Sequence, residues 1–102
     1  MTYKVAYIIG SLSSNSINRK LVGAMIADAP DDLEFVEADF SKLPLYSPDY
    51  DANYPQIATD FKKILEDADA VLIATPEYDR SIPGGLKNAI DWFGRPWGSN
   101  PI

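Results

Sequence analysis

Short apolar segments and longer amphipathic segments alternate along the chain. Residues 3–9, 33–38 and 70–75 are rich in aliphatic, aromatic and β-branched side chains, and glycine, aspartate or proline follows each of them. Such short apolar runs bounded by turn residues are typical of strands. The sequence therefore predicts three strands, the first of them a buried strand of a parallel sheet.

The first amphipathic segment follows the strand at residues 3–9. Ser14 or Ser16 can cap its amino terminus, and Pro30 lies beyond its end. Its apolar residues recur at the three- and four-residue spacing of a helix, which places them on one face. These residues are Ile17, Leu21, Val22, Met25 and Ile26.

Two further helices are predicted after the second and third strands. One covers residues 56–67 with Pro55 at its start, and the other runs from a Ser81 cap to Trp92, with Pro83 tolerated in the first turn. The faces expected to be buried carry Ile57, Phe61, Ile64, Leu65 and Ala68 in one helix and Leu86, Ile90 and Phe93 in the other.

The connection over residues 39–54 is long and contains two prolines and three tyrosines. Long ordered loops often carry function, although a surface loop that wraps the domain is the simpler interpretation. We expect the wrapping loop and keep a functional loop as the alternative.

The order strand, helix, strand, helix, strand, helix predicts an α/β fold with a parallel sheet, right-handed crossovers and helices on both faces. This is a three-layer, flavodoxin-like arrangement with strand order 2-1-3, whereas a flavodoxin-like sheet has five strands in the order 2-1-3-4-5. We therefore expect residues 1–102 to form one domain that is truncated after the third strand. Either the chain is a fragment of a longer protein, which we favour, or the open strand edge pairs with another copy.

Composition narrows the chemistry. The chain has 102 residues, of which 46% are hydrophobic, enough for one modest core. With 15 acidic and 9 basic residues and a net charge of −6, it has no basic surface for nucleic acid or an anionic membrane. No apolar run is long enough to span a bilayer and no signal-peptide pattern occurs, so we expect a cytoplasmic protein.

The chain contains no Cys and no His. Thiol nucleophiles, imidazole bases and the usual zinc ligands are therefore excluded, and we expect no metal site. Redox or group-transfer chemistry would have to come from a bound cofactor that the protein positions.

Residues 10–19 form a polar loop between the first strand and the first helix. Unpaired N–H groups and the positive end of the dipole at a helix amino terminus favour an anion, and the serine and asparagine side chains can add hydrogen bonds. The loop lacks the Lys-Ser or Lys-Thr of a Walker sequence and the Gly-x-Gly-x-x-Gly of a dinucleotide site. An ordinary polar loop with a helix cap is the alternative.

Residues 75–85 form a second loop at the end of the third strand. In the order 2-1-3 the switch point lies between the first and third strands, so both loops meet where ligands bind in such sheets. An aromatic side chain and several backbone amides in this loop could line a flat heteroaromatic ring. A proline-bounded turn capped by Ser81 is the alternative.

The residues in these two loops resemble those of a known family. Gly-Ser-Leu at residues 10–12, Ser-Ile-Asn-Arg at 16–19 and, above all, TPEYDRSIPGGLKNAIDW at 75–92 are similar to the NAD(P)H-dependent FMN reductases of flavodoxin-like fold. This group includes quinone, chromate and azo reductases. The resemblance extends over essentially the whole chain, and members of the family continue further with two more strands.

The resemblance implies FMN as the cofactor and NAD(P)H as the co-substrate. Hydride would pass from NAD(P)H to FMN and two electrons on to a quinone or similar small-molecule acceptor, without a catalytic side chain. The residues that the resemblance implies around the phosphate are Ser11, Leu12, Ser13, Ser16, Ile17 and Asn18. Those that it implies around the flavin ring are Pro76, Glu77, Tyr78 and Asp79.

The resemblance also implies a homodimer or homotetramer, and Tyr46, Tyr50, Trp92 and Trp97 could form its interface. Two positions depart from the family pattern. Many relatives carry Arg where Ser13 or Ser14 stands, and most carry Asn where Asp79 stands. A non-catalytic flavin-binding module or a self-associating fragment is the alternative function.

Overall fold

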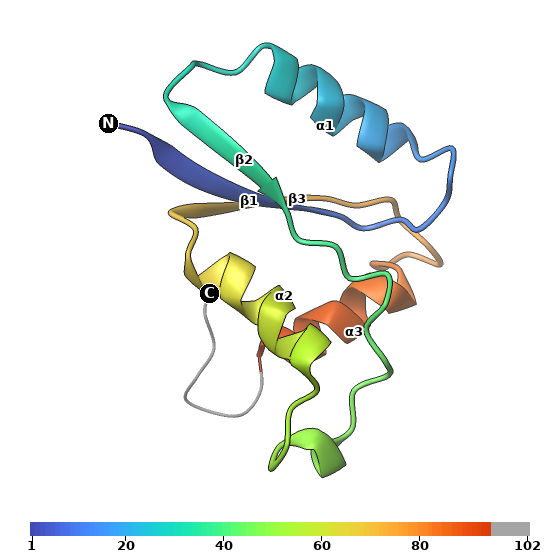
Figure 1. The fold of residues 1–102 in the computed structure, drawn as a ribbon. Coiled ribbons are helices and arrows are strands. Elements are labelled where there is room, and N and C mark those ends of the chain that lie inside the picture. The colour runs from blue at the N-terminus through green and yellow to red at the C-terminus, as the bar shows by residue number, and fades with distance from the viewer. Residues whose placement is uncertain (95–102) are drawn as a thin grey trace.

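The computed structural model describes residues 1–94, which form a three-stranded parallel sheet with helices on both faces (Figure 1). The strands are β1 (Tyr3–Ile9), β2 (Leu33–Glu37) and β3 (Ala70–Ala74), in the spatial order β2-β1-β3. The α/β fold class and the strand order predicted from the sequence are confirmed.

The helices are α1 (Ile17–Ala27), α2 (Gln56–Glu66) and α3 (Gly84–Phe93). Helix α1 lies on one face of the sheet, and α2 and α3 lie side by side on the other (Figure 1). Within residues 1–94 the structure has no helix that is both long enough and apolar enough to cross a bilayer.

The register of the strands aligns the carboxyl ends of β1 and β3. Ile9 lies opposite Ala74, and the N–H of Gly10 donates a hydrogen bond of 2.7 Å to the Ala74 carbonyl oxygen. The chain then leaves both strands at the same edge of the sheet. The two polar loops therefore begin side by side, as the switch-point argument requires.

The main core lies between the sheet and helices α2 and α3. Ala6 and Ile8 of β1 are fully buried there, together with Leu65 of α2 and with Leu86 and Ala89 of α3. Ile57 is not part of this core, because its side chain is 40% exposed. The predicted buried face of α2 is therefore wrong at Ile57. Lys62, which was not predicted to be buried, is buried in this helix.

The predicted buried face of α1 is largely wrong. Val22 is the one residue of α1 that is buried, while Ile17, Leu21 and Met25 are 79%, 52% and 44% exposed. Val22 therefore anchors the helix to the sheet, and Ile26 is partly buried.

Residues 39–54 wrap over α3, as expected, and include the 3-10 helix η1 (Pro48–Tyr50). Trp92 of α3 is 1% exposed, and its Nε1–H donates a 2.7 Å hydrogen bond to the Pro44 carbonyl oxygen. The rings of Tyr46, Tyr50 and Tyr54 surround it at centroid distances of 5.1–5.3 Å.

The aromatic residues proposed for a subunit interface therefore pack against one another within the chain. Trp92 is thus buried by contacts within the chain, and Tyr46 and Tyr50 are partly buried beside it. Trp97 lies outside the described residues.

The start of α3 differs from the prediction. Pro83 occupies the N-cap position and makes no side-chain cap, and the helix begins at Gly84. Ser81 lies earlier, where its N–H donates to the Tyr78 carbonyl and its own carbonyl accepts from the Tyr78 N–H, at 3.1 and 2.9 Å. The predicted Ser81 cap is wrong because these hydrogen bonds hold Ser81 in a hairpin.

Candidate functional site

The loop between β1 and α1 is held by its own serine side chains. Ser16 is the N-cap, and its Oγ accepts a hydrogen bond of 3.2 Å from the Arg19 N–H. Ser11 Oγ accepts the Ser13 N–H at 3.1 Å, and both Ser11 and Ser16 are 7% exposed. The N–H groups in the first turn of α1 have no partner within the helix, so the loop presents donors suited to an anion.

Gly10 sets the start of this loop against the end of β3. A Cβ at this position would lie 3.0 Å from both Leu86 Cδ2 and Thr75 Oγ1. A larger residue would therefore push the two loops apart.

The loop after β3 contains a tight two-residue turn. Asp79 and Arg80 have φ angles of 51° and 66°, and the paired hydrogen bonds between Tyr78 and Ser81 close the turn. Two successive left-handed residues are typical of a type I′ hairpin turn, in which Asn-Gly is the preferred pair. The backbone here is strained, since neither residue is glycine.

The two loops meet. Ser11 Oγ and Tyr78 Oη lie 3.3 Å apart, and a cavity of about 220 Å³ opens beside them. The structure brings together in this cavity seven of the residues that the sequence predicted and also Asn15. The seven are Ser11, Ser13, Ser16, Ile17, Asn18, Pro76 and Tyr78.

A second cavity of about 230 Å³ continues from the first across Ser13 and Tyr78. Leu12, Phe40 and Pro83 line it, and Gly84 and Gly85 provide a flat backbone surface. A Cβ on Gly85 would lie 3.1 Å from the Phe40 ring. This hollow is more apolar than the first, and together the two reach the size of typical ligand sites.

The remaining predicted residues lie at the rim. Glu77 lines a more open hollow of about 350 Å³ with Pro76 and Arg80. Asp79 lines none of these three cavities and is exposed at the tip of the hairpin. Of the ten predicted residues, Asp79 is the one that the geometry does not bring to a cavity.

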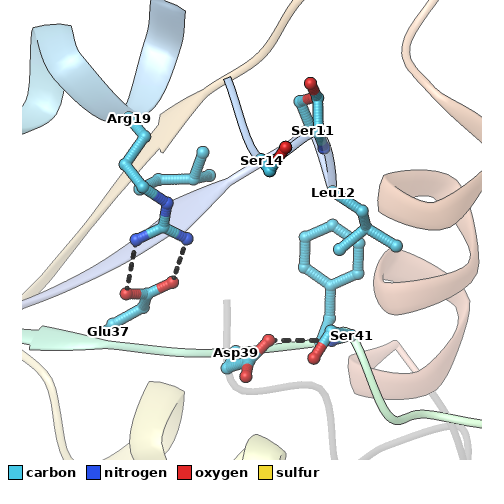
Figure 2. A pocket seen from close by; sticks show the side chains of 10 residues that line it. Ser11, Leu12, Ser14, Arg19, Glu37, Asp39 and Ser41 are labelled. Atoms are coloured by element: carbon cyan, nitrogen blue, oxygen red, sulfur yellow. Dashed lines mark hydrogen bonds and ion pairs between the residues drawn. The ribbon is translucent and has the colours of Figure 1, made fainter. Parts of the chain in front are cut away.

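A fourth cavity, of about 250 Å³, lies on the β2 side of the first loop (Figure 2). Arg19 binds Glu37 through two hydrogen bonds of 3.1 and 2.9 Å, and Asp39 accepts the Ser41 N–H at 2.9 Å. The hydrogen bonds that Arg19 donates to the Glu37 carboxylate raise the pKa of Arg19, and the hydrogen bond from the Ser41 backbone N–H lowers the pKa of Asp39.

The sequence analysis did not single out this cavity, because no local motif sets Glu37 and Asp39 apart from the other acidic residues of the chain. The feature of the sequence that could have indicated this cavity is the position of Glu37 and Asp39 at the carboxyl end of the second strand, which lies next to the loop that carries Arg19.

Comparison with known proteins identifies the family. The family described as "NADPH-dependent FMN reductase" matches residues 3–102. This chain belongs to that family. Among relatives of similar sequence, a 2-hydroxy-1,4-benzoquinone reductase from Burkholderia sp is 50% identical over 100 residues, which are 98% of this chain and 55% of that protein.

A quinone reductase from Pseudomonas putida is 43% identical over 99 residues, which cover 96% of this chain and 53% of that protein. Among solved structures, FerB from Paracoccus denitrificans, a flavoenzyme NAD(P)H:(acceptor) oxidoreductase, matches with a TM-score of 0.91 and 43% identity over 98% of this chain and 55% of its own. The chain spans about half the length of the relatives that it matches.

The residues present fit the FMN that this family uses. The first cavity offers serine hydroxyls, the Asn18 amide and the amino terminus of α1 to a phosphate, and the second offers an apolar, glycine-floored surface to a flat ring. Arg19 is the one cationic residue among residues 10–19, and its guanidinium is already paired with Glu37. The phosphate would thus be held by neutral donors and the helix dipole.

Proposed function

We propose that the protein to which this chain belongs is an NAD(P)H-dependent FMN oxidoreductase that reduces a quinone or a similar small acceptor. The observation that carries the proposal is the junction of the two loops, where Ser11 and Tyr78 lie 3.3 Å apart and a polar cavity adjoins an apolar one. Quinone reductases among the relatives support the class of acceptor.

When bound, FMN supplies the redox chemistry: it accepts a hydride from NAD(P)H and returns two electrons to the acceptor. NAD(P)H, a proton and a quinone thus give NAD(P)⁺ and a hydroquinone. The side chains of this chain would bind and orient. Ser11, Ser16 and Asn18 would hold the phosphate, and the backbone of residues 76–79 would border the ring.

Helix α3 and the wrapping loop would shape the floor of the ring site. Phe40 touches the surface at Gly85, and the ring site opens beside the first turn of α3. This arrangement needs no acid or base from the protein, which agrees with a chain that contains neither His nor Cys.

The test is reduction and reoxidation of added FMN on the purified chain. Under anaerobic conditions, NADH or NADPH should bleach the absorbance of the bound flavin, and a benzoquinone should restore it with one hydroquinone formed per reduced nucleotide consumed. Flavin that is bound but not reduced by either nucleotide would favour the non-catalytic flavin-binding module.

Ser16→Ala and Ser47→Ala form a matched pair for this test. Each serine caps a helix by accepting a backbone N–H, but Ser16 lies at the phosphate cavity and Ser47 lies at η1. Ser16→Ala should weaken FMN binding about tenfold, because it removes a hydroxyl and loosens the N–H groups of α1. Ser47→Ala should leave FMN binding unchanged, and equal effects would contradict the assignment of the phosphate site.

A homodimer or homotetramer and a cytoplasmic location complete the proposal. Both stay predictions from the sequence and from the family resemblance. Light scattering at the elution peak of the purified protein measures the first directly.

A further inference from the structure

Residues 40–46 form the first part of the loop that wraps over α3, between the end of β2 and η1 (Figure 1). This segment contains no helix or strand, so its position depends on its contacts with other elements. Its first residue, Phe40, lines the apolar hollow assigned to the flavin ring. Whatever fixes the segment therefore also fixes one wall of the ring site.

Two side chains of α3 bind this segment at a single carbonyl group. Asn88 Nδ2–H donates a hydrogen bond of 2.9 Å to the Pro44 carbonyl oxygen, and Trp92 Nε1–H donates one of 2.7 Å to the same oxygen. Asn88 and Trp92 are four residues apart and therefore lie on one face of the helix. A carbonyl oxygen has two lone pairs, so these two donors satisfy it completely.

Asn88 makes a second hydrogen bond to the same segment. Its Oδ1 accepts the Tyr46 N–H at 2.8 Å. The amide thus bridges a carbonyl and an N–H two residues apart, as a residue of a neighbouring parallel strand would. The bridge needs a donor and an acceptor on one side chain. An amide has both, whereas a carboxylate has acceptors only.

A short turn connects Pro44 to the ring site. The Leu43 N–H donates a 3.2 Å hydrogen bond to the Phe40 carbonyl oxygen, and Leu43 packs against the core that contains Phe40. Phe40 is 5% exposed, and its Cε2 atom would lie 3.1 Å from a Cβ on Gly85. Because a packed interior transmits displacement, a shift of Pro44 would move the Phe40 ring.

We propose that Asn88 is a positioning residue of the flavin ring site, because it holds residues 40–46 on α3 and so keeps the Phe40 ring against Gly85. The inference rests on the proposed function, since it assumes that the flavin ring lies in the hollow beside Phe40. Asn88 lines neither hollow assigned to FMN, so it acts on the ring site through this segment. Trp92 acts in the same way through the Pro44 carbonyl.

The experiment measures the binding of FMN and riboflavin to the wild-type chain, Asn88→Asp and Trp92→Phe by flavin fluorescence. Asn88→Asp keeps the acceptor for the Tyr46 N–H but removes the donor to Pro44, and Trp92→Phe keeps an aromatic ring but removes the other donor. Each variant should bind both flavins about fivefold more weakly, as expected if the closed arrangement falls to about one fifth of the population. The ratio of the two dissociation constants should not change, because the phosphate loop is intact.

The absorption spectrum of the bound flavin separates positioning from a general loss of stability. A flavin ring in an enclosed apolar hollow shows fine structure in its visible absorption band, and contact with water removes it. At saturating flavin, both variants should show less fine structure than the wild type. Weaker binding with an unchanged spectrum would mean that the hydrogen bonds only stabilise the fold, and a changed ratio of FMN to riboflavin affinity would place the effect at the phosphate. Either result would overturn the inference.

Asn53→Asp is the matched control, since it adds the same charge at an exposed position of the same loop. It should leave both dissociation constants and the spectrum unchanged. An effect as large as that of Asn88→Asp would show a general charge effect and overturn the inference. Circular dichroism confirms that each variant is folded, and Trp92→Phe provides the readout if Asn88→Asp is not.

The wild-type chain distinguishes failure of the inference from failure of the proposed function. A wild type that binds both flavins, with Asn88→Asp and Trp92→Phe binding them equally well, contradicts the positioning role alone. A wild type that binds neither flavin contradicts the proposed function, and the inference fails with it.

Discussion

The substitution Gly10→Ala adds one methyl group where β1, β3 and α3 come together. The new Cβ would lie 3.0 Å from Leu86 Cδ2, 3.0 Å from Thr75 Oγ1 and 3.1 Å from Thr75 Cβ. Neither neighbour can move easily, since Leu86 is 1% exposed and the Thr75 hydroxyl donates a 2.8 Å hydrogen bond to the Pro76 carbonyl. The strand ends must therefore separate.

Overpacking by one methyl group in a closed site costs about 1–3 kcal/mol of unfolding free energy. Gly23→Ala is the matched control. No atom outside its local backbone lies within 4 Å of a Cβ at this position in α1. Alanine is there expected to stabilise the chain by about 0.5–1 kcal/mol, since glycine is unfavourable inside a helix.

Urea unfolding followed by tryptophan fluorescence measures both variants, because Trp92 is buried and becomes exposed on unfolding. The midpoint should fall by on the order of 1 M for Gly10→Ala and rise for Gly23→Ala. FMN affinity should fall for the first variant only. A Gly10→Ala chain as stable as the wild type would refute the close approach of the two loops.

Three further substitutions test other parts of the site. Ser16→Ala should lower the unfolding free energy by about 1 kcal/mol in the same urea assay, because the α1 cap is lost; no change would mean that Ser16 does not cap α1 in solution. Asp79→Asn should raise stability by a few tenths of a kcal/mol or more, because asparagine tolerates the left-handed conformation better. FMN binding should stay unchanged, because Asp79 lines none of the cavities beside the two loops, and a lower dissociation constant for FMN would show that its side chain reaches the flavin. Since the folded-state pKa of Asp39 is lowered, its contribution to stability is present above about pH 4 and is lost as the pH falls through the folded value. The stability difference between wild type and Asp39→Asn should therefore shrink between pH 7 and pH 3, and a difference independent of pH would contradict the hydrogen bond from Ser41.

The sheet could be predicted from the sequence because each strand is a short apolar run bounded by Gly, Pro or Asp. The alternation of strands and helices indicated a parallel sheet, and the strand order 2-1-3 came from the flavodoxin-like arrangement. The candidate site followed with it, because residues that follow parallel strands gather at one edge. Seven of the ten predicted residues accordingly line one cavity.

What the sequence could not reveal depended on tertiary contacts. The apolar spacing of α1 predicts a buried face, but burial also requires a neighbouring element, and in the described structure Val22 is the one residue of α1 that is buried. Ser81 resembled a helix cap because serine suits caps and tight turns equally well, and its hydrogen bonds with Tyr78 decided for the turn. Arg19 and Glu37 lie 18 residues apart in sequence, and no local pattern joins them.

The most direct test of the central claim compares FMN with riboflavin, which lacks the phosphate. Both are titrated into the purified chain, and flavin fluorescence gives the two dissociation constants. If the loop at residues 10–18 holds the phosphate, FMN should bind at least about tenfold more tightly than riboflavin, and Ser16→Ala should narrow that ratio. Equal affinity for the two flavins, or binding of neither, would contradict the account.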